Sequence, residues 1–223
     1  MENKTVLGFS YSNCWDYENG FYLTTPSSRL AKSIAHWEIY KRIAQLPGEI
    51  IEFGVFKGAS LIRWATYREI LESQSSRKLI GFDAFGGFPV SGTAEDVEFI
   101  NQFETQSGVG IDEKEMDYAL KAKGFSNYEL IKGNILETLP EYIKKTPQLK
   151  IALLHIDVDV YEPAKKILDL LFDKVVTGGI IVLDDYGVVA GETKAVDNFL
   201  HSIPEQYSVE KLPFYKVPSF LVK

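Results

Sequence analysis

The chain has 223 residues, of which 45% are hydrophobic and 25% are charged, and its formal net charge is −7. A chain of this length can bury a core without a disulfide or a metal to stabilise it. Nucleic-acid-binding proteins usually have an excess of basic residues, whereas this chain has an excess of acidic ones, so we expect no nucleic-acid partner. The single cysteine, Cys14, cannot form an internal disulfide, and no run of about 18 apolar residues predicts a membrane span. Because the first residues also lack the apolar core of a signal peptide, we expect a cytoplasmic protein with no membrane partner.

The first part of the chain alternates helix signals with a short apolar run. Ser27 and Ser28 predict the N-cap of a helix over about Arg29–Gln45. The apolar run Glu49–Phe53 predicts a strand, and Gly58 predicts the start of the next helix.

The middle of the chain continues this alternation. Lys78–Phe82 and Tyr128–Lys132 predict the second and third strands. Between them, Asp112 and Glu115 have the spacing of a capping box, which predicts the start of a helix that Gly124 ends.

The last third of the chain contains two further apolar runs. Lys150–Asp157 predicts the fourth strand and Ile180–Asp185 the fifth. Pro163 fits the first turn of the helix between them, and the pair Gly178-Gly179 is expected to end that helix. The remaining expected elements are two short C-terminal strands and helices over Leu139–Lys145 and Ala195–His201.

Strands that are apolar throughout and alternate with helices are typical of a parallel sheet covered on both faces. We therefore predict an α/β fold with a single doubly wound, mostly parallel sheet over residues 29–223. Residues 1–28 are expected to form an arm that covers a substrate pocket, mediates self-association or simply packs on the domain. Six aromatic residues gather in this arm: Phe9, Tyr11, Trp15, Tyr17, Phe21 and Tyr22.

Glycines and carboxylates dominate the positions that follow the predicted strands, where a doubly wound sheet binds its ligands. Gly54 permits close approach of a ligand to the backbone, and Gly58 begins a helix whose free N–H groups suit a carboxylate. Asp83 ends the second strand, where it can accept two ribose hydroxyls. Together these residues suit an adenosine with an amino-acid tail, as in S-adenosylmethionine. The alternative is that two glycines and an acid are ordinary strand–helix turn residues.

A second group of candidates consists of aspartates. Asp157 and Asp184 are 27 residues apart, about one strand–helix–strand unit, so they can lie at the tips of neighbouring strands. With Asp185 they would repel one another unless a cation lies between them. Oxygen ligands suit Mg²⁺, which lowers the pKa of a coordinated hydroxyl, and Asp159 lies within reach of that proton as a general base. The alternative is that Asp184 and Asp185 cap a helix and Asp157 is a solvated strand end.

Four separated motifs, IIEFGVFKGASL, GFDAFGGFP, LLHIDVDVYEP and GGIIVLDDYG, resemble the macrocin O-methyltransferase family over about Thr24–Phe199. The resemblance implies a class I S-adenosylmethionine-dependent methyltransferase that acts on a sugar hydroxyl. It implies cofactor contacts at Glu52, Gly54, Gly58 and Ser60 near the methionine end, at Asp83 near the ribose, and at Gly133 and Asn134 near the adenine. It also implies a divalent metal held by Asp157, Asp184 and Asp185, with Asp157 shared with the cofactor site, and Asp159 as the general base.

Several other residues have a structural interpretation. We expect His155 to be a core histidine, His36 and His201 to lie on the surface or at an interface, and Cys14 to be a small buried group. The segment Ser91–Asp117 carries eight acids against one lysine, which is typical of a solvated face and also fits a mobile lid.

The main functional hypothesis is therefore a metal-dependent O-methyltransferase that acts on a hydroxyl of a sugar or glycosylated small molecule and could form a homo-oligomer. A catechol-like phenol is the alternative acceptor, because the same acids could bind two adjacent oxygens. Two alternative hypotheses come from other functional classes: a non-catalytic cofactor-binding protein and a phospho-acceptor receiver module. A receiver module places its aspartate pair after the first strand, whereas here the pair follows the fifth.

Overall fold

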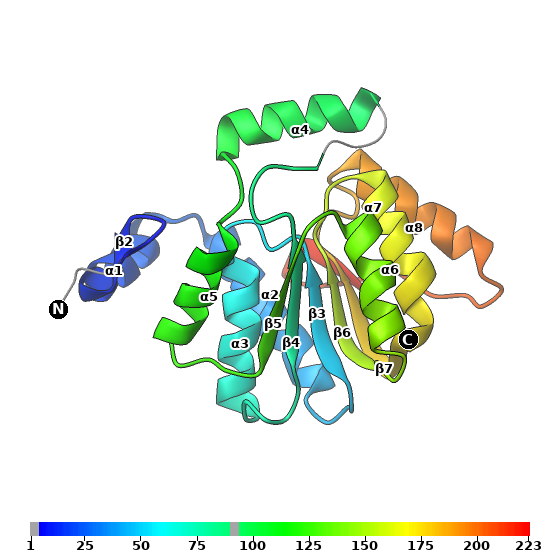
Figure 1. Cartoon of the computed structure of the whole chain (residues 1–223), viewed down its shortest axis with the longest axis horizontal. Helices are drawn as coiled ribbons and strands as arrows, with labels where there is room; N and C mark the ends of the chain where they lie inside the picture. The colour runs from blue at the N-terminus through cyan, green and yellow to red at the C-terminus, as the bar shows by residue number, and fades with distance from the viewer. Residues whose placement is uncertain (1–4, 90–93) are drawn as a thin grey trace.

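A central sheet of seven strands with helices on both faces forms the body of the protein (Figure 1). The computed structural model describes residues 5–89 and 94–223. The strand order is β5-β4-β3-β6-β7-β9-β8. The strands of this sheet are β3 (Glu49–Phe53), β4 (Leu79–Asp83), β5 (Tyr128–Lys132), β6 (Ile151–Ile156), β7 (Val175–Leu183), β8 (Glu210–Leu212) and β9 (Tyr215–Val222).

The first five strands of the sheet pair in parallel, whereas β9 pairs antiparallel with both β7 and β8. The chain runs from β3 outward through β4 to β5 and then returns to β6 on the other side of β3. The strand order therefore reverses between β3 and β6, and a doubly wound sheet binds its ligands at the carboxyl ends of the strands beside such a reversal. The predicted fold class and the ends of all five parallel strands are confirmed.

Two hydrophobic clusters fill the space between the sheet and its helices. One face packs against α2 (Ser27–Ile43), α3 (Ala59–Leu71) and α5 (Glu113–Ala122). The other face packs against α6 (Ile135–Lys145), α7 (Tyr161–Leu171) and α8 (Ala190–Ser202). Strands buried on both faces explain why the apolar runs in the sequence are continuous rather than alternating.

The remaining elements lie outside these layers. A hairpin of β1 (Thr5–Val6) and β2 (Phe9–Ser10), a short 3₁₀ helix η1 (Tyr11–Asn13) and α1 (Cys14–Thr24) lie to one side of the sheet, next to α5 (Figure 1). The helix α4 (Ala94–Ser107) lies above the carboxyl ends of the strands (Figure 1). It forms most of the acidic segment, whose first residues, Ser91 to Thr93, lie outside the described residues. None of the helices in the described ranges is long and apolar enough to cross a membrane.

Four local predictions are wrong. Gly178-Gly179 lies inside β7, because α7 already ends at Leu171 and a 3₁₀ turn, η2 (Phe172–Lys174), leads directly into the β-branched pair that begins the strand. Ser27 and Ser28 are the first residues of α2 rather than its cap, which is Pro26. His36 is fully buried rather than on the surface. Cys14 is exposed rather than buried, because α1 buries none of its residues.

The capping box at α5 is half formed. Asp112 is the N-cap, and its side chain accepts a hydrogen bond from the Lys114 N–H (2.9 Å). The Glu115 carboxylate accepts instead from the backbone N–H of Leu7, so this residue ties the N-terminal hairpin to the body of the protein.

Candidate active site

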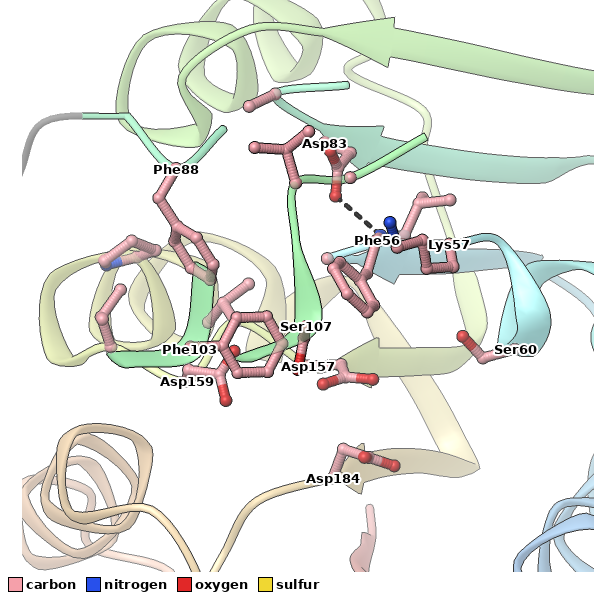
Figure 2. A pocket seen from close by; sticks show the side chains of 18 of the residues that line it. Phe56, Lys57, Ser60, Asp83, Phe88, Phe103, Ser107, Asp157, Asp159 and Asp184 are labelled. Atoms are coloured by element: carbon pink, nitrogen blue, oxygen red, sulfur yellow. Dashed lines mark hydrogen bonds between the residues drawn. The ribbon is translucent and has the colours of Figure 1, made fainter. Parts of the chain in front are cut away.

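A pocket of about 460 Å³ opens at the carboxyl ends of β3, β4, β6 and β7 (Figure 2). Most of the predicted site residues line it: Gly54, Ser60, Asp83, Gly133, Asn134, Asp157, Asp159, Asp184 and Asp185. Glu52 and Gly58 do not line it and lie behind its wall. The topology therefore brings together residues that are up to about 130 positions apart in the sequence, as the parallel sheet predicts.

The loop after β3 brings the backbones of two strand ends together. Gly54 has φ +87°, and a Cβ atom there would lie 1.6 Å from the carbonyl oxygen of Asp157. The Gly54 N–H donates to the carbonyl of Phe82, and the Asp157 N–H donates to the carbonyl of Phe53, which continues the ladder to the tips of the strands. Only glycine fits at this position, because any Cβ atom would overlap the backbone of Asp157.

Asp83 holds two loops through its carboxylate. Its Oδ2 accepts a hydrogen bond from the Phe56 N–H (3.0 Å; Figure 2). Its Oδ1 accepts one from the Phe85 N–H (2.5 Å). Burial raises the pKa of Asp83, and these backbone hydrogen bonds act in the opposite direction. Each carboxylate oxygen has two lone pairs, so Asp83 can still accept hydroxyls from a ligand.

Glu52 and Ser60 form a buried pair beside the pocket. The Ser60 hydroxyl donates to Glu52 Oε1 at 2.7 Å, and Glu52 is fully buried in β3. Gly58 ends the loop with φ +82° as the N-cap of α3. Of the residues expected at the methionine end, Gly54 and Ser60 therefore face the pocket, while Glu52 and Gly58 shape it from behind.

On the far side of Asp83, the loop after β5 supplies Gly133 and Asn134. The Gly133 N–H donates to the backbone carbonyl of Asp83 (2.9 Å), and Asn134 Oδ1 accepts from the Leu136 N–H (3.0 Å) as the N-cap of α6. The amide NH₂ group of Asn134 is not needed for this cap, so it can serve a ligand.

Four aspartates line the other half of the pocket. Carboxylate oxygens of Asp157, Asp184 and Asp185 all lie within 4.8 Å of one another. Burial and the neighbouring carboxylates raise the pKa of Asp157 well above its usual range and that of Asp185 to about 6. Burial and Asp185 raise the pKa of Asp159 to about 8, and Asp159 also has an unusual φ of +62°. The structure thus brings the carboxylates of Asp157, Asp184 and Asp185 together at the tips of β6 and β7.

Asp184 differs from its neighbours because an ammonium group and two histidine rings surround it. Burial opposes its ionisation, but His155, His36 and Lys32 outweigh burial and hold its pKa well below the usual range. Lys32 Nζ donates to Asp184 Oδ2 at 2.5 Å, and His155 Nε2 lies 3.4 Å from Asp184 Oδ1. Asp184 is therefore the carboxylate of this cluster that ionises most readily.

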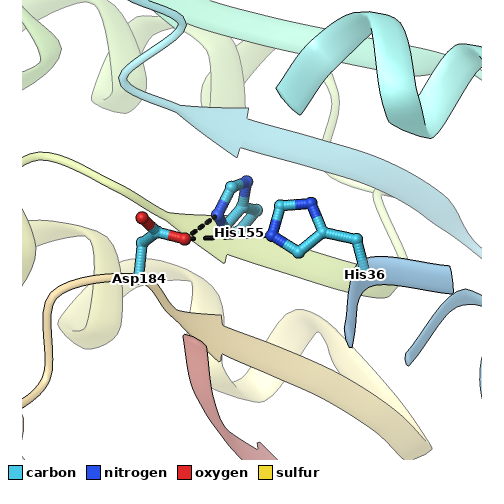
Figure 3. A group of neighbouring side chains, drawn as sticks. All are labelled: His36, His155 and Asp184. Atoms are coloured by element: carbon cyan, nitrogen blue, oxygen red, sulfur yellow. Dashed lines mark hydrogen bonds and ion pairs between the residues drawn. The ribbon is translucent and has the colours of Figure 1, made fainter. Parts of the chain in front are cut away.

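Behind Asp184, the buried side chains of His155 and His36 face its carboxylate (Figure 3). Glu52 and Trp64 also contact His155. His155 Nδ1 lies 3.4 Å from Glu52 Oε2, and Trp64 Nε1 lies 3.2 Å from the same nitrogen. Burial would lower the pKa of His155, but its hydrogen bonds to Asp184 and Glu52 outweigh burial and raise it to about 9. The Trp64 indole N–H donates to His155 Nδ1, so it is the Nε2 N–H of His155 that faces Asp184. His155 is thus a partnered core histidine, as its place in the strand predicted.

Three residues of this region had no functional signal in the sequence. Lys32 and His36 lie one turn apart on α2 and both face Asp184. Burial lowers the pKa of His36 to about 3, so it is neutral and stacks on the ring of Trp64, 4.5 Å between ring centroids. Glu192 in α8 is fully buried, and its Oε1 accepts from the Asp185 N–H (3.1 Å).

An aromatic wall closes the upper part of the pocket (Figure 2). It consists of Phe56 from the β3 loop, Phe88, and Phe103 from α4, with ring centroids 5.2 Å apart for Phe56–Phe103 and 5.8 Å for Phe88–Phe103. Glu104 Oε1 fixes the wall by accepting from the Phe88 N–H (2.8 Å). The helix α4 therefore contributes an apolar surface to the pocket as well as its acidic outer residues.

One further observation indicates that these carboxylates could hold a divalent cation. Asp185 Oδ2 is buried and accepts no hydrogen bond from any residue that the structure describes. A buried carboxylate oxygen without a donor is costly, and a cation would satisfy it. The oxygen-only ligand set is the type that Mg²⁺ prefers.

Comparison with known proteins places most of the chain in one family of sequences. Residues 28–210 match the family model described as Macrocin-O-methyltransferase (TylF). The chain is 29% identical over 163 residues to demethyldecarbamoylnovobiocin O-methyltransferase of Streptomyces niveus, a match that covers 69% of this chain and 58% of the relative. It is 28% identical over 152 residues to 8-demethyl-8-(2,3-dimethoxy-alpha-L-rhamnosyl)-tetracenomycin-C 4'-O-methyltransferase of Streptomyces olivaceus, covering 65% and 55%. The matches thus span little more than half the length of these curated relatives.

Solved structures agree with the fold. The crystal structure of CalS11, calicheamicin methyltransferase, superposes with a TM-score of 0.79 at 26% identity, covering 97% of this chain and 88% of that one. The structure of the O-methyltransferase NovP superposes with a TM-score of 0.73 over 86% of this chain and 78% of that one, and at 20% identity it supports the fold alone.

Proposed function

The chain belongs to the macrocin O-methyltransferase family, and we propose that it transfers a methyl group from S-adenosylmethionine to a hydroxyl of a sugar-bearing small molecule. The observation that carries this proposal is the division of one pocket into two chemically different halves. Gly54, Asp83 and Asn134 line one half, and Asp157, Asp159 and Asp184 line the other.

The first half suits the cofactor. The backbone at Gly54 and Ser60 at the start of α3 both line this half of the pocket. Asp83 can accept the two ribose hydroxyls, and the free amide of Asn134 can bind the adenine edge. When bound, S-adenosylmethionine supplies an electrophilic methyl group on its sulfonium sulfur.

The second half suits the acceptor hydroxyl. An alcohol is a weak nucleophile until its proton is removed, and Asp159 is the group we assign to that step. Its pKa, raised to about 8, makes Asp159 a stronger base than an ordinary carboxylate while part of the population is ionised near neutral pH. As the acceptor oxygen bonds to the methyl carbon, the hydroxyl proton passes to Asp159.

We further propose that Asp157, Asp184 and Asp185 hold a divalent cation, with Mg²⁺ as the expected ion. Such an ion would lower the pKa of an acceptor hydroxyl bound to it. The donor-free Oδ2 of Asp185 and the mutual proximity of the three carboxylates support this assignment.

The acceptor class rests on the relatives. Two of the similar proteins are named for a rhamnose-type sugar. The Streptomyces olivaceus relative is named for a dimethoxy-rhamnosyl group, and CalS11 is described as a TDP-rhamnose 3'-O-methyltransferase. For this chain, a hydroxyl of a deoxysugar is therefore the proposed acceptor. A catechol-like phenol is the second candidate, because the wall of Phe56, Phe88 and Phe103 offers a surface on which a flat aromatic ring can stack.

Methyl transfer from labelled S-adenosylmethionine tests these proposals. We expect label in a deoxysugar glycoside or a nucleotide-linked deoxysugar in the presence of Mg²⁺, and little label in a simple catechol. EDTA should remove the activity and Mg²⁺ should restore it. Transfer to the catechol alone would favour the second candidate, and full activity in EDTA would contradict the metal assignment. Cofactor binding without transfer to any acceptor would favour a non-catalytic binding protein.

The arm before α2 supports self-association as a further part of the proposal. Its side chains Trp15 and Leu23 are 73% and 85% exposed, which is unusual for large apolar residues on one short helix. We expect a dimer or larger assembly in sedimentation velocity, and a shift towards monomer in the variant W15S/L23S. A wild-type chain that sediments as a monomer at high concentration would contradict this expectation.

A further inference from the structure

We propose that Lys32 is the resident cation of the aspartate cluster and competes with the divalent ion for Asp184. This inference rests on the proposed metal site at Asp157, Asp184 and Asp185. It concerns a residue of α2, which contributes no predicted metal ligand, cofactor contact or base. In the structure the Lys32 ammonium already occupies one oxygen of the residue that the ion would need.

The contact is specific and largely shielded from water. Lys32 Nζ lies 2.5 Å from Asp184 Oδ2, with the side chains only 17% and 5% exposed. The other oxygen of Asp184 is also engaged, because Oδ1 faces His155 Nε2 at 3.4 Å and His36 Nε2 at 3.9 Å. Both oxygens of Asp184 therefore have cationic or N–H neighbours before any metal arrives.

The charges of the cluster explain why a lysine lies there. Five acidic side chains gather at the tips of β6 and β7 and on α8: Asp157, Asp159, Asp184, Asp185 and Glu192. Among the described residues, the cations that contact them are Lys32 and, when protonated, His155. Without Lys32, the ionised Asp184 would keep only the buried histidines, and a carboxylate that loses its ammonium partner is strongly destabilised.

A divalent ion and the Lys32 ammonium are both positive and share one carboxylate. Their repulsion across a few ångströms lowers ion affinity by about tenfold or more, even at the effective dielectric of a protein surface. The ion must either displace the ammonium from Asp184 Oδ2 or bind while the ammonium still repels it. Lys32 is long and partly exposed, so it can move toward the pocket mouth, whereas the three aspartates are fixed at strand ends.

Two opposite consequences follow from this arrangement. Lys32 stabilises the metal-free protein, because it neutralises part of the cluster, and it weakens metal binding, because it must be displaced or opposed. A purely structural lysine would produce the first effect without the second.

Mn²⁺ binding to the cofactor-free full chain separates these roles. The variants are Lys32→Met, which removes the charge, and Lys32→Arg, which keeps it. Lys41→Met serves as the matched control, because Lys41 also forms an ion pair on α2, with Glu38 at 2.8 Å, but on the exposed surface. Affinity is measured by calorimetry and by the electron paramagnetic resonance signal of free Mn²⁺, and thermal unfolding is measured in EDTA and in saturating Mn²⁺.

We expect Lys32→Met to bind Mn²⁺ at least tenfold more tightly than the wild type, and Lys32→Arg and Lys41→Met to stay within about threefold. In EDTA, Lys32→Met should unfold several degrees below the wild type, and saturating Mn²⁺ should close that gap. If Lys32→Met is too unstable to purify without metal, it is prepared in Mn²⁺ and its affinity is measured by competition with a chelator.

Each other outcome either contradicts a distinct statement or supports the competition. Equal or weaker Mn²⁺ binding by Lys32→Met, with measurable binding by the wild type, overturns the competition but leaves the metal site intact. No Mn²⁺ binding by any variant overturns the metal site and the competition together. Binding by Lys32→Met alone supports the competition in its strongest form, in which the lysine excludes the ion.

Discussion

The two halves of the pocket are held in place by different means. Around Asp83, the positions are fixed by the backbone, because both carboxylate oxygens accept amide N–H groups and the neighbouring turn requires a glycine at Gly54. Around Asp184, they are fixed by charge, because aspartates crowd against one lysine and one histidine. The first half is therefore complete before a ligand binds, while the state of the second half depends on which cations and protons occupy it.

The largest effect should come from breaking the backbone half at Gly54. A Gly54→Ala variant places a Cβ atom 1.6 Å from the carbonyl oxygen of Asp157 in a left-handed conformation, so the tips of β3 and β6 must separate. We expect a loss of about 3–5 kcal/mol of unfolding free energy and no measurable binding of S-adenosylhomocysteine. Chemical denaturation and calorimetry measure both.

Gly124→Ala is the matched control for this variant. Gly124 has a similar φ of +77°, but a Cβ atom there would meet nothing within 4 Å, so only the conformational strain of about 1–2 kcal/mol applies. Equal losses for the two variants would show that the close approach at Gly54 has no special role.

The charge half should respond in turnover rather than in cofactor affinity. Asp159→Asn removes the proposed base with little change in shape, so methyl transfer should fall by about 10²–10⁴-fold while S-adenosylhomocysteine binds as before. Added Mg²⁺ should not restore the rate, because the lost group is a proton acceptor. A rate within tenfold of the wild type would assign the proton to another acceptor.

The same half should also make the metal-free protein sensitive to pH. Asp159, with its pKa raised to about 8, and His155, with its pKa raised to about 9, both bind more protons in the folded than in the unfolded chain between pH 6.5 and 8. Stability falls with pH wherever the folded state binds more protons, so we expect a loss of about 3 kcal/mol across this window in EDTA. The lowered pKa of His36 opposes this fall only slightly, by less than about 0.5 kcal/mol, because an unfolded histidine is half protonated at pH 6.5. The lowered pKa of Asp184 acts below the window. Urea denaturation at pH 6.5 and pH 8 checks this, and rising stability would contradict the shifts.

The smallest effect should come from one hydrogen-bonding side chain of the backbone half. Asp83→Asn keeps an oxygen for one amide N–H but replaces the other with a donor, and we expect cofactor affinity to fall about tenfold. Asp173→Asn is the control, because Asp173 is a fully exposed aspartate that does not line the pocket. Unchanged affinity in Asp83→Asn, measured by calorimetry, would remove Asp83 from the ribose site.

The sequence predicted the strand-end residues of both halves better than the helix residue that contacts them. Strand ends can be located from apolar runs. The sequence therefore predicts Gly54, Asp83, Asp157 and the Asp184-Asp185 pair at the carboxyl ends of the strands, and the structure places them there. Lys32 could not be predicted in the same way, because its partner Asp184 is 152 residues away and a lysine on an amphipathic helix is usually solvated. Contacts between a helix face and a strand tip depend on how the layers pack, which local periodicity does not contain.

The same limit explains the errors at His36 and Cys14. His36 lies on α2, where a polar residue is usually exposed, but it stacks on Trp64 from the next helix and is buried. Cys14 lies on α1, which has no covering layer among the described residues and buries none of its side chains. In both cases the tertiary environment, rather than the residue type, decided the burial.

A crystal structure of the chain soaked with S-adenosylhomocysteine and Mn²⁺ tests the central claim, the division of the pocket, most directly. We predict the ribose at Asp83, the amino-acid tail beside Gly54, and an anomalous Mn²⁺ peak about 2.2 Å from oxygens of Asp157, Asp184 and Asp185. The ammonium of Lys32 should then have left Asp184 or lie farther from it than 2.5 Å. A cofactor bound elsewhere, or full cofactor occupancy with no anomalous peak and Lys32 still on Asp184, would contradict the account.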